Sequence, residues 1–146
     1  MKKILKNSFT GIAFMLVLLV GCDVIKGLPT NTTGGLFSLN GSWKMESSSE
    51  NNALAGTTIT VYPVSGEGII TTIQNNTYCV RANDVMWKSI TSNSGSFTIS
   101  NLVNSCNSSI NYKPATLTVI TNEEVRLSGN TANGASLVQT WKRVVK

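Results

Sequence analysis

The sequence predicts an all-β fold, a small antiparallel up-and-down β-barrel, with a β-sandwich as the alternative. From residue 39 onward, no window of the sequence has the i, i+3, i+4 apolar spacing of an amphipathic helix. Short runs with an apolar residue at every second position recur instead. The breaks between these runs are too short for crossover connections, which indicates that successive strands pair in an antiparallel manner.

Alternation defines the strands that we expect. It is clearest in three runs, 58–62, 115–119 and 124–128, whose paired inward positions are Ile59 and Val61, Leu117 and Val119, and Val125 and Leu127. The other candidates are residues 41–46, 68–74, 77–81, 85–90, 96–103 and 137–144, and residues 100–104 fit a single helical turn equally well. Turn-forming residues separate the runs at 65–68, 75–76, 83–84, 93–95, 122–123 and 133–134. The pattern predicts eight or nine strands of about six residues each.

Residues 1–21 precede the domain and have the features of a secretory signal peptide. Three lysines lie among the first six residues, an apolar run follows, and Gly21 stands directly before Cys22. The apolar run has about half of the roughly 20 residues that a transmembrane helix needs. We therefore expect the peptide to be cleaved; a short membrane anchor with an incidental cysteine is the alternative.

The segment LVGC at residues 19–22 resembles the lipobox of bacterial lipoproteins, in which the cysteine is diacylated and becomes the new N-terminus. The resemblance implies a lipoprotein of the bacterial cell envelope, anchored in a membrane through Cys22, with the outer membrane favoured over the inner. Residues 22–38 are rich in Thr and Gly, which predicts a flexible tether after the lipidated cysteine. Such a tether would hold the domain of residues 39–146 on the order of 20 Å from the membrane.

Charge and composition exclude several classes of function. The formal charge of +5 includes the three signal lysines, and without them nine basic and seven acidic side chains remain, a balance of +2. A basic face for nucleic acid therefore has no support, and no nucleic-acid partner is expected. The chain has no histidine, which removes imidazole catalysis, Ser-His and Cys-His pairs and most zinc sites. We expect neither a metal nor another cofactor.

Two cysteines remain in the domain once Cys22 is lipidated, and we expect them to form a disulfide. Cys79 and Cys106 enclose 26 residues, and in an oxidising compartment their bond would stabilise the fold by about 3 to 4 kcal/mol. A redox or metal-binding dithiol is the competing interpretation. It is disfavoured because the chain has no C-x-x-C spacing and no histidine.

A tryptophan and an arginine lie near opposite ends of the domain sequence. Trp43 follows Gly41 in the first expected strand, and Arg143 lies near the end of the last. This arrangement resembles the lipocalin-like (calycin) pattern, in which G-x-W plugs the barrel base and a basic side chain stacks across the indole. The likeness covers residues 39–146 and is nearest to the short lipocalin-like domains of Gram-negative lipoproteins. It implies that Gly41, Trp43 and Arg143 close one end of a barrel.

Other interpretations of the apolar residues stay open. In a sandwich, the three tryptophans would simply be core aromatics. In a barrel of eight strands, the interior either fills or leaves room for one small ligand. The side chains that we expect to line a pocket for a small hydrophobic ligand are Trp87, Ile59, Val61, Leu117 and Val119. If these side chains pack together instead, the polar loops at 47–52, 92–96 and 107–111 become the candidate surface for a protein or glycan partner.

We do not expect an enzyme. Most of the acidic residues lie in or beside expected turns, and only Glu46 and Glu50 lie near a strand end. No G-x-S-x-G or S-x-x-K signature stands at a suitable strand end. The sequence predicts a non-catalytic, membrane-anchored lipoprotein whose barrel binds a small apolar ligand or acts as an envelope accessory module. The alternative is a filled barrel that binds a protein or glycan through its loops.

Overall fold

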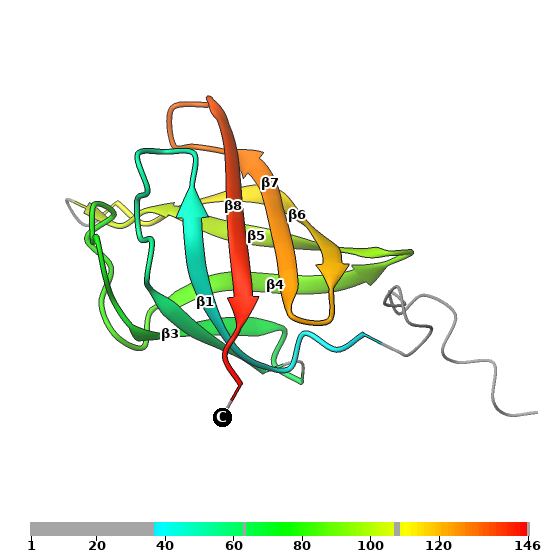
Figure 1. Ribbon diagram of the computed structural model, residues 1–146. Coiled ribbons are helices and arrows are strands. Elements are labelled where there is room, and N and C mark those ends of the chain that lie inside the picture. The colour runs from blue at the N-terminus through cyan, green and yellow to red at the C-terminus, as the bar shows by residue number, and fades with distance from the viewer. Residues whose placement is uncertain (1–36, 63, 107–108, 146) are drawn as a thin grey trace, which may run out of the picture.

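The computed structural model describes residues 37–62, 64–106 and 109–145, which form a closed barrel of eight antiparallel strands. The strands are β1 (Gly41–Ser48), β2 (Thr58–Tyr62), β3 (Glu67–Thr72), β4 (Val85–Asn93), β5 (Ser96–Asn104), β6 (Asn111–Thr121), β7 (Glu124–Asn130) and β8 (Ser136–Arg143). Each strand pairs with its neighbours in the chain, and β8 closes the barrel against β1 (Figure 1). The up-and-down barrel is confirmed, and the β-sandwich alternative is wrong.

The expected signal peptide, Cys22 and most of the expected tether lie outside the described residues. The packed part of the chain includes Phe37, which is only 2% exposed although we expected it to belong to the tether. Among the described residues, no helix is long and apolar enough to cross a membrane.

One expected strand, Thr77–Arg81, is not a strand. The Asn76 side chain donates a hydrogen bond to the Val80 carbonyl (2.8 Å) and accepts one from the Val80 N–H (2.9 Å), which closes this segment into a turn. Cys79 adopts a left-handed backbone conformation with φ of 57°, which a strand does not accommodate. The alternation that suggested a strand is real, because Tyr78 and Val80 are buried, but they pack across the end of the barrel.

Several strands are longer than the expected six residues. Strand β6 has 11 residues and includes Pro114, which stands opposite Ser100 of β5. Strands β4 and β5 have nine residues each, and β5 extends through Asn104, so the alternative of a helical turn at 100–104 is wrong. The expected run 96–103 covers β5 except for its last residue, 85–90 covers the first part of β4, and 115–119 covers only the middle of β6.

The two ends of the barrel are closed differently. At one end, β1 begins and β8 ends; we call it the arginine end because Arg143 lies there. At the other end, which we call the disulfide end, the β1–β2 connection brings in buried Leu54 and the β3–β4 connection brings in Tyr78 and Val80. Both connections are drawn over this end in Figure 1.

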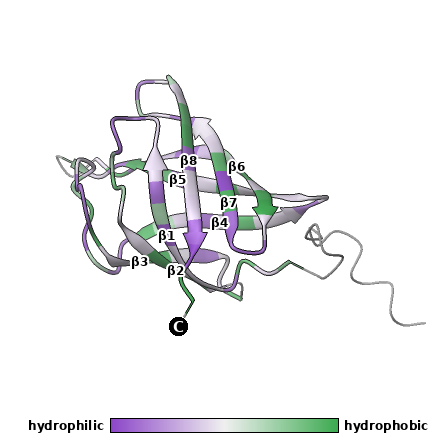
Figure 2. Cartoon of the chain, in the orientation of Figure 1, coloured by the Kyte–Doolittle hydropathy of each residue, from purple (hydrophilic) through white to green (hydrophobic). Residues whose placement is uncertain are grey.

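The interior of the barrel is filled by side chains from alternate positions of the strands. Buried and more exposed residues alternate along β2, β7 and β8, and Figure 2 shows hydrophobic and hydrophilic residues within the same sheet. The largest fully buried side chains are Trp43, Trp87, Trp141, Met45, Leu54, Ile59, Ile70, Met86, Leu102, Leu117, Leu127 and Leu137. With these side chains in place, most of the barrel interior is a packed core.

Candidate functional site

The arginine end is built around Trp43, which points inward from the start of β1 and is fully buried. Its indole N–H donates a hydrogen bond to the Leu39 carbonyl (2.8 Å), so the segment before β1 folds back over the ring. The guanidinium carbon of Arg143 lies 4.3 Å from the centre of the Trp43 ring, within the range of a cation–π contact. Tryptophan and arginine, 100 positions apart in the sequence, thus form one stacked pair.

Arg143 also links three segments of backbone. Its Nη1 donates to the Asn40 carbonyl (2.7 Å), its Nη2 to the Ser38 carbonyl (2.6 Å), and its Nε to the Asn122 carbonyl in the β6–β7 turn (3.0 Å). Burial lowers the pKa of Arg143, and the charge of Glu123 opposes that effect. The side chain therefore fastens the segment before β1 to the ends of β6 and β8.

The third residue of the expected closing group, Gly41, lies beside the same guanidinium. Its φ of +119° belongs to a region that side-chain-bearing residues rarely adopt, and a Cβ there would lie 3.2 Å from Arg143 Nη1. The structure therefore brings Gly41, Trp43 and Arg143 together at one barrel end, in the arrangement that the resemblance implied.

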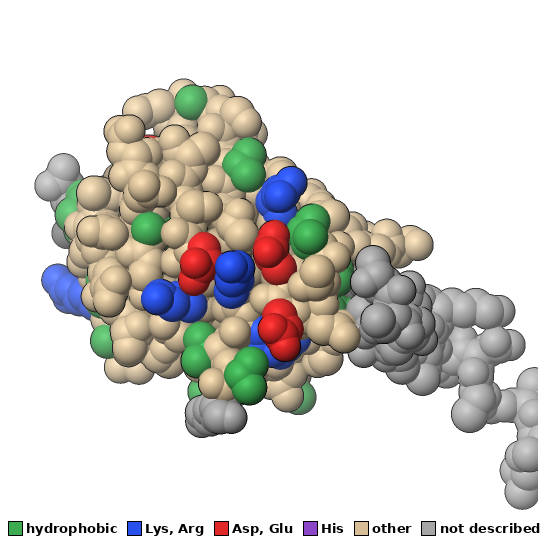
Figure 3. Space-filling model, in the orientation of Figure 1, with side chains coloured by type: hydrophobic (Ala, Val, Ile, Leu, Met, Phe, Trp, Pro, Cys, Tyr) green, Lys and Arg blue, Asp and Glu red, His purple; other side chains and the backbone are tan. Residues whose placement is uncertain are grey.

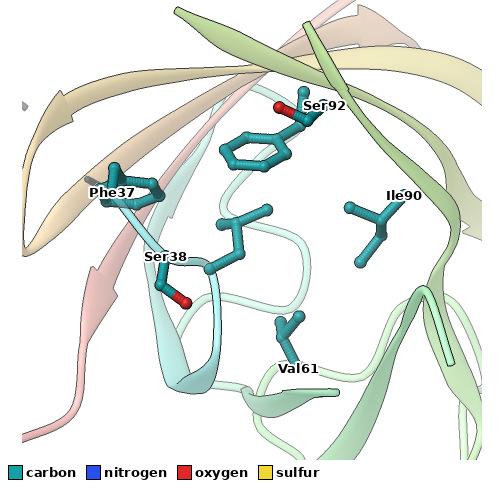
Figure 4. A pocket seen from close by; sticks show the side chains of 7 residues that line it. Phe37, Ser38, Val61, Ile90 and Ser92 are labelled. Atoms are coloured by element: carbon teal, nitrogen blue, oxygen red, sulfur yellow. The ribbon is translucent and has the colours of Figure 1, made fainter. Parts of the chain in front are cut away.

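An apolar pocket of about 190 Å³ opens at this end, between the segment before β1 and strands β2, β4 and β5. It is lined by Phe37, Ser38, Leu39, Val61, Ile90, Ser92 and Phe97. In Figure 4, Phe37 and Ser38 face Ile90 and Val61 across the hollow. The Phe37 ring lies 6.1 Å from that of Trp43 and 6.0 Å from that of Phe97, so the pocket wall continues into the stacked pair.

Of the five residues expected to line a ligand pocket, Val61 alone lines this one. Trp87, Ile59 and Leu117 are fully buried in the packed core, and Val119 is partly buried against it. The prediction missed Phe37 because this residue was assigned to the tether. It missed Leu39 because this residue was placed at the start of the domain, next to the tether. The apolar alternation of Phe37 and Leu39 just before the first strand was the signal that would have found them.

A second pocket, of about 270 Å³, lies outside the barrel wall near the disulfide end. Its lining is more polar and consists of Asn83, Asp84, Val85, Leu102, Ser105, Ile110 and Tyr112. The Tyr112 hydroxyl donates to the Val85 carbonyl (2.7 Å), and Lys88 Nζ lies 3.6 Å from the centre of the Tyr112 ring. Burial, followed by the charges of Asp84 and Glu67, raises the pKa of Tyr112.

The expected disulfide is present at the disulfide end. Cys79 and Cys106 are bonded with a Cα–Cα distance of 4.9 Å, which joins the β3–β4 connection to the segment after β5. Next to it, the Tyr78 hydroxyl donates a hydrogen bond to Glu50 of the β1–β2 connection. Burial, together with this bond and the charge of Glu50, raises the pKa of Tyr78 well above its ordinary value.

The outer surface carries charges of both signs. Figure 3 shows basic and acidic side chains interspersed over the face formed by β1, β7 and β8. Lys142 of β8 stands opposite Lys44 of β1 on one side and Glu124 of β7 on the other. Within the described residues, no group of three or more His, Cys, Asp or Glu side chains is placed to hold a metal ion.

Comparisons with known proteins add no relative to this description. No protein-family model matches the chain, and neither the curated proteins nor the solved structures contain a match. The proposals below therefore depend on the sequence and the geometry alone.

Proposed function

We propose that this protein is a non-catalytic lipoprotein of the bacterial cell envelope whose barrel binds a small apolar group, such as the end of a lipid acyl chain, at its arginine end. The observation that carries the proposal is the apolar pocket beneath Phe37 and Leu39. It lies at the barrel end where the chain arrives from Cys22, the expected site of lipidation. Only 14 residues separate Cys22 from Phe37.

The length of this connection sets the distance between pocket and membrane. A coil of about 15 residues spans on the order of 20 Å, and a fully extended chain about 50 Å. A lipid anchored at Cys22 would therefore keep the arginine end of the barrel within reach of the bilayer surface. The domain would work near a high local concentration of acyl chains.

Exposed apolar side chains support the same orientation. Tyr62 and Val64, at the β2–β3 turn, and Val144 and Val145, after β8, all belong to the arginine end and are at least 40% exposed. Apolar side chains are grouped near the C-terminus in Figure 3. Such residues are favourable where a surface meets the interfacial region of a membrane.

The size and lining of the pocket limit what it binds. At about 190 Å³ it is smaller than the roughly 300 to 1,000 Å³ of sites for drug-sized ligands, but larger than the ~150 Å³ engineered cavity that accepts benzene. Five of its seven lining residues are apolar, and the two others are serines. The site fits one ring or a short stretch of hydrocarbon, and not a charged metabolite.

The anchor is tested with Cys22→Ser in the producing bacterium. We expect the unchanged protein to fractionate with membranes, to lack residues 1–21 and to carry the mass of the attached acyl groups, and the variant to carry no acyl mass. An unchanged protein that keeps residues 1–21 and carries no acyl mass would contradict the lipoprotein proposal and support a plain membrane anchor.

The pocket is tested with a fluorescent dansyl fatty acid and the variant Ile90→Phe, which fills the hollow. We expect measurable binding by the unchanged protein and at least a tenfold loss of affinity in Ile90→Phe. Ile110→Phe is the matched control, because it adds the same volume at the other pocket and is expected to leave binding unchanged. Absence of binding, or equal binding by Ile90→Phe, would refute the acyl-chain site.

A second candidate function rests on the polar pocket near the disulfide end. Ile110 is 66% exposed at its rim, beside amide, carboxylate and phenol groups that suit a protein or glycan partner. Under this alternative, Ile110→Ser and Asn83→Ala would weaken co-purification of envelope glycan or protein by several-fold, while Ile90→Phe would have no effect. The two sets of variants therefore separate the two functions.

A further inference from the structure

Three inward-facing residues carry all the buried side-chain nitrogen and oxygen atoms that have no hydrogen-bond partner in the described part of the chain. These atoms are Trp87 Nε1, both amide atoms of Asn101, and Gln139 Nε2. The three residues lie on β4, β5 and β8, and none is more than 1% exposed. Buried polar atoms without a partner are few in native structures, so each of these four needs an explanation.

The three residues belong to one continuous cluster. Trp87 stands directly opposite Asn101 in the β4–β5 ladder. The Trp87 ring meets the Trp141 ring edge to face, with centres 4.9 Å apart, and Trp141 Nε1 donates to Gln139 Oε1 (3.2 Å). We call Trp87, Asn101, Gln139 and Trp141 the polar band; it connects β4 and β5 to β8 within the barrel.

The packing around Trp87 leaves its indole little freedom to find another partner. Gly68 lies opposite Trp87 in the β3–β4 ladder, and a Cβ at Gly68 would lie 3.4 Å from two Trp87 atoms and 3.2 Å from Ile59 Cδ1. The backbone of Gly68 therefore packs directly against the Trp87 ring. The indole N–H stays buried because the ring is held there.

An apolar side chain in place of Asn101 or Gln139 would avoid the cost of burying polar atoms without partners. Leu has nearly the shape of Asn, and Met that of Gln, and both pack well in a barrel interior. A buried donor or acceptor without a partner carries the full penalty of its lost hydration. Four such atoms on connected residues therefore need partners that the described side chains do not supply.

The chemistry of the cluster defines a molecule that would supply these partners. It offers three N–H donors, from Trp87, Asn101 and Gln139, and one acceptor, Asn101 Oδ1. No charged side chain is buried in the part of the barrel that the structure describes, so an ion there would have no counter-charge. We propose that the polar band is an internal binding site for a small neutral molecule with an acceptor oxygen and a hydroxyl or amide hydrogen.

Water is the smallest molecule of this class, and a short alcohol or amide is the organic alternative. Both place an oxygen acceptor against the N–H groups and a hydrogen against Asn101 Oδ1. Buried waters typically make about three hydrogen bonds to such groups. The site is independent of the lipid anchor and of the apolar pocket at the arginine end, so it can be tested separately from the proposed function.

Two measurements on the purified, ¹⁵N-labelled protein distinguish a bound water from a bound organic molecule. Native mass spectrometry detects an organic molecule as a one-to-one adduct that is lost on unfolding. NMR detects a long-lived water as a cross-peak between the Trp87 indole N–H and the water signal. Either result supports the site. The absence of both the adduct and the cross-peak would overturn the proposal.

Isosteric variants connect the signal to the named atoms. Asn101→Leu and Gln139→Met are expected to abolish the adduct, or to shorten the residence time of the water at least tenfold. Thr98→Leu is the matched control, because it changes the outer face of the same strand and should leave the signal intact. A signal that survives in both core variants would overturn the assignment to the polar band.

Stability supplies a second readout if a variant changes the spectrum too much to assign. If the site is occupied, Asn101→Leu lowers the denaturant midpoint, because it displaces a bound molecule and leaves Trp87 and Gln139 unpartnered. If the cluster is empty, the same change raises the midpoint by removing two unpartnered atoms.

Discussion

The two ends of the barrel are closed by different means. At the arginine end, closure is non-covalent: Arg143 stacks on Trp43 and binds carbonyls 103 and 105 positions away in the chain. At the disulfide end, closure is local and covalent: the Cys79–Cys106 bond joins segments 27 positions apart over buried Tyr78. The arginine end carries the apolar pocket next to its closing residues, whereas the closure of the disulfide end depends on the redox state.

This difference predicts which changes each end will tolerate. The arginine end depends on a few side chains, and replacing them should lower the free energy of unfolding in any solvent. The disulfide end should be sensitive to reduction and to the protonation of Tyr78.

Trp43→Ala is expected to have the largest effect, lowering the free energy of unfolding by about 3 to 5 kcal/mol. The change removes a fully buried indole and leaves Arg143 without the ring on which it stacks. Denaturant unfolding followed by circular dichroism measures it. Tyr62→Ala, at an exposed position of the same end, should cost less than about 0.5 kcal/mol; a similar loss in both variants would show that Trp43 does not close the barrel.

Removing the disulfide with the pair Cys79→Ser and Cys106→Ser is expected to lower the free energy of unfolding by about 3 to 4 kcal/mol, chiefly because the unfolded chain gains conformational entropy. Hydrogen exchange should quicken in the β3–β4 connection and remain unchanged in residues 37–42 at the arginine end. Reduction of the unchanged protein should reproduce the same pattern. An equal increase in exchange rate at both ends would contradict the proposed difference between them.

Arg143→Met is expected to cost about 1 to 3 kcal/mol, because it keeps the aliphatic stem and loses the charge-assisted bonds to three carbonyls. Arg143→Lys restores the charge without the planar fork, and we expect it to recover less than half of that loss. Urea titration of the three proteins provides the comparison. Full recovery by lysine would indicate that charge alone, and not the forked geometry, closes the arginine end.

Gly41→Ala is expected to cost about 1 kcal/mol or more, because its φ is +119° and the new methyl group would crowd Arg143. Gly134→Ala is the matched control at the disulfide end, where φ is +84° and a Cβ would meet nothing within 4 Å. Thermal unfolding should show a larger loss for Gly41→Ala. Equal losses would mean that backbone strain is the whole effect and that contact with Arg143 contributes nothing.

The smallest effect is expected from pH. Because the pKa of Tyr78 is higher in the folded protein than in the unfolded chain, unfolding releases a proton once the pH exceeds about 10. The free energy of unfolding should then fall with rising pH, by at most ~1.4 kcal/mol per pH unit for this group. Tyr78→Phe should weaken that dependence, as measured by denaturation between about pH 8.5 and 11. Tyr112 contributes with the same sign in both proteins, so an unchanged slope would refute the role of Tyr78.

Sequence alternation predicted the strands best where it was uninterrupted. The run 58–62 matches β2 at both ends, and Ile59 and Val61 face inward as expected. Alternation gave a wrong prediction at Thr77–Arg81, where the same pattern belongs to a loop whose residues Tyr78 and Val80 pack into the barrel end. Alternation reports which side chains are buried; it does not report whether the backbone between them has a strand partner.

By itself, the sequence determined the all-β class, the inward faces of the clearest strands and the pairing of Cys79 with Cys106. All three depend on local periodicity or on the small number of available partners. Only the tertiary structure shows that Phe37 and Leu39 form a pocket wall, and that Trp87, Asn101 and Gln139 have buried polar atoms without partners. Those features join residues that are distant in the chain, and their contacts exist only after the barrel has closed.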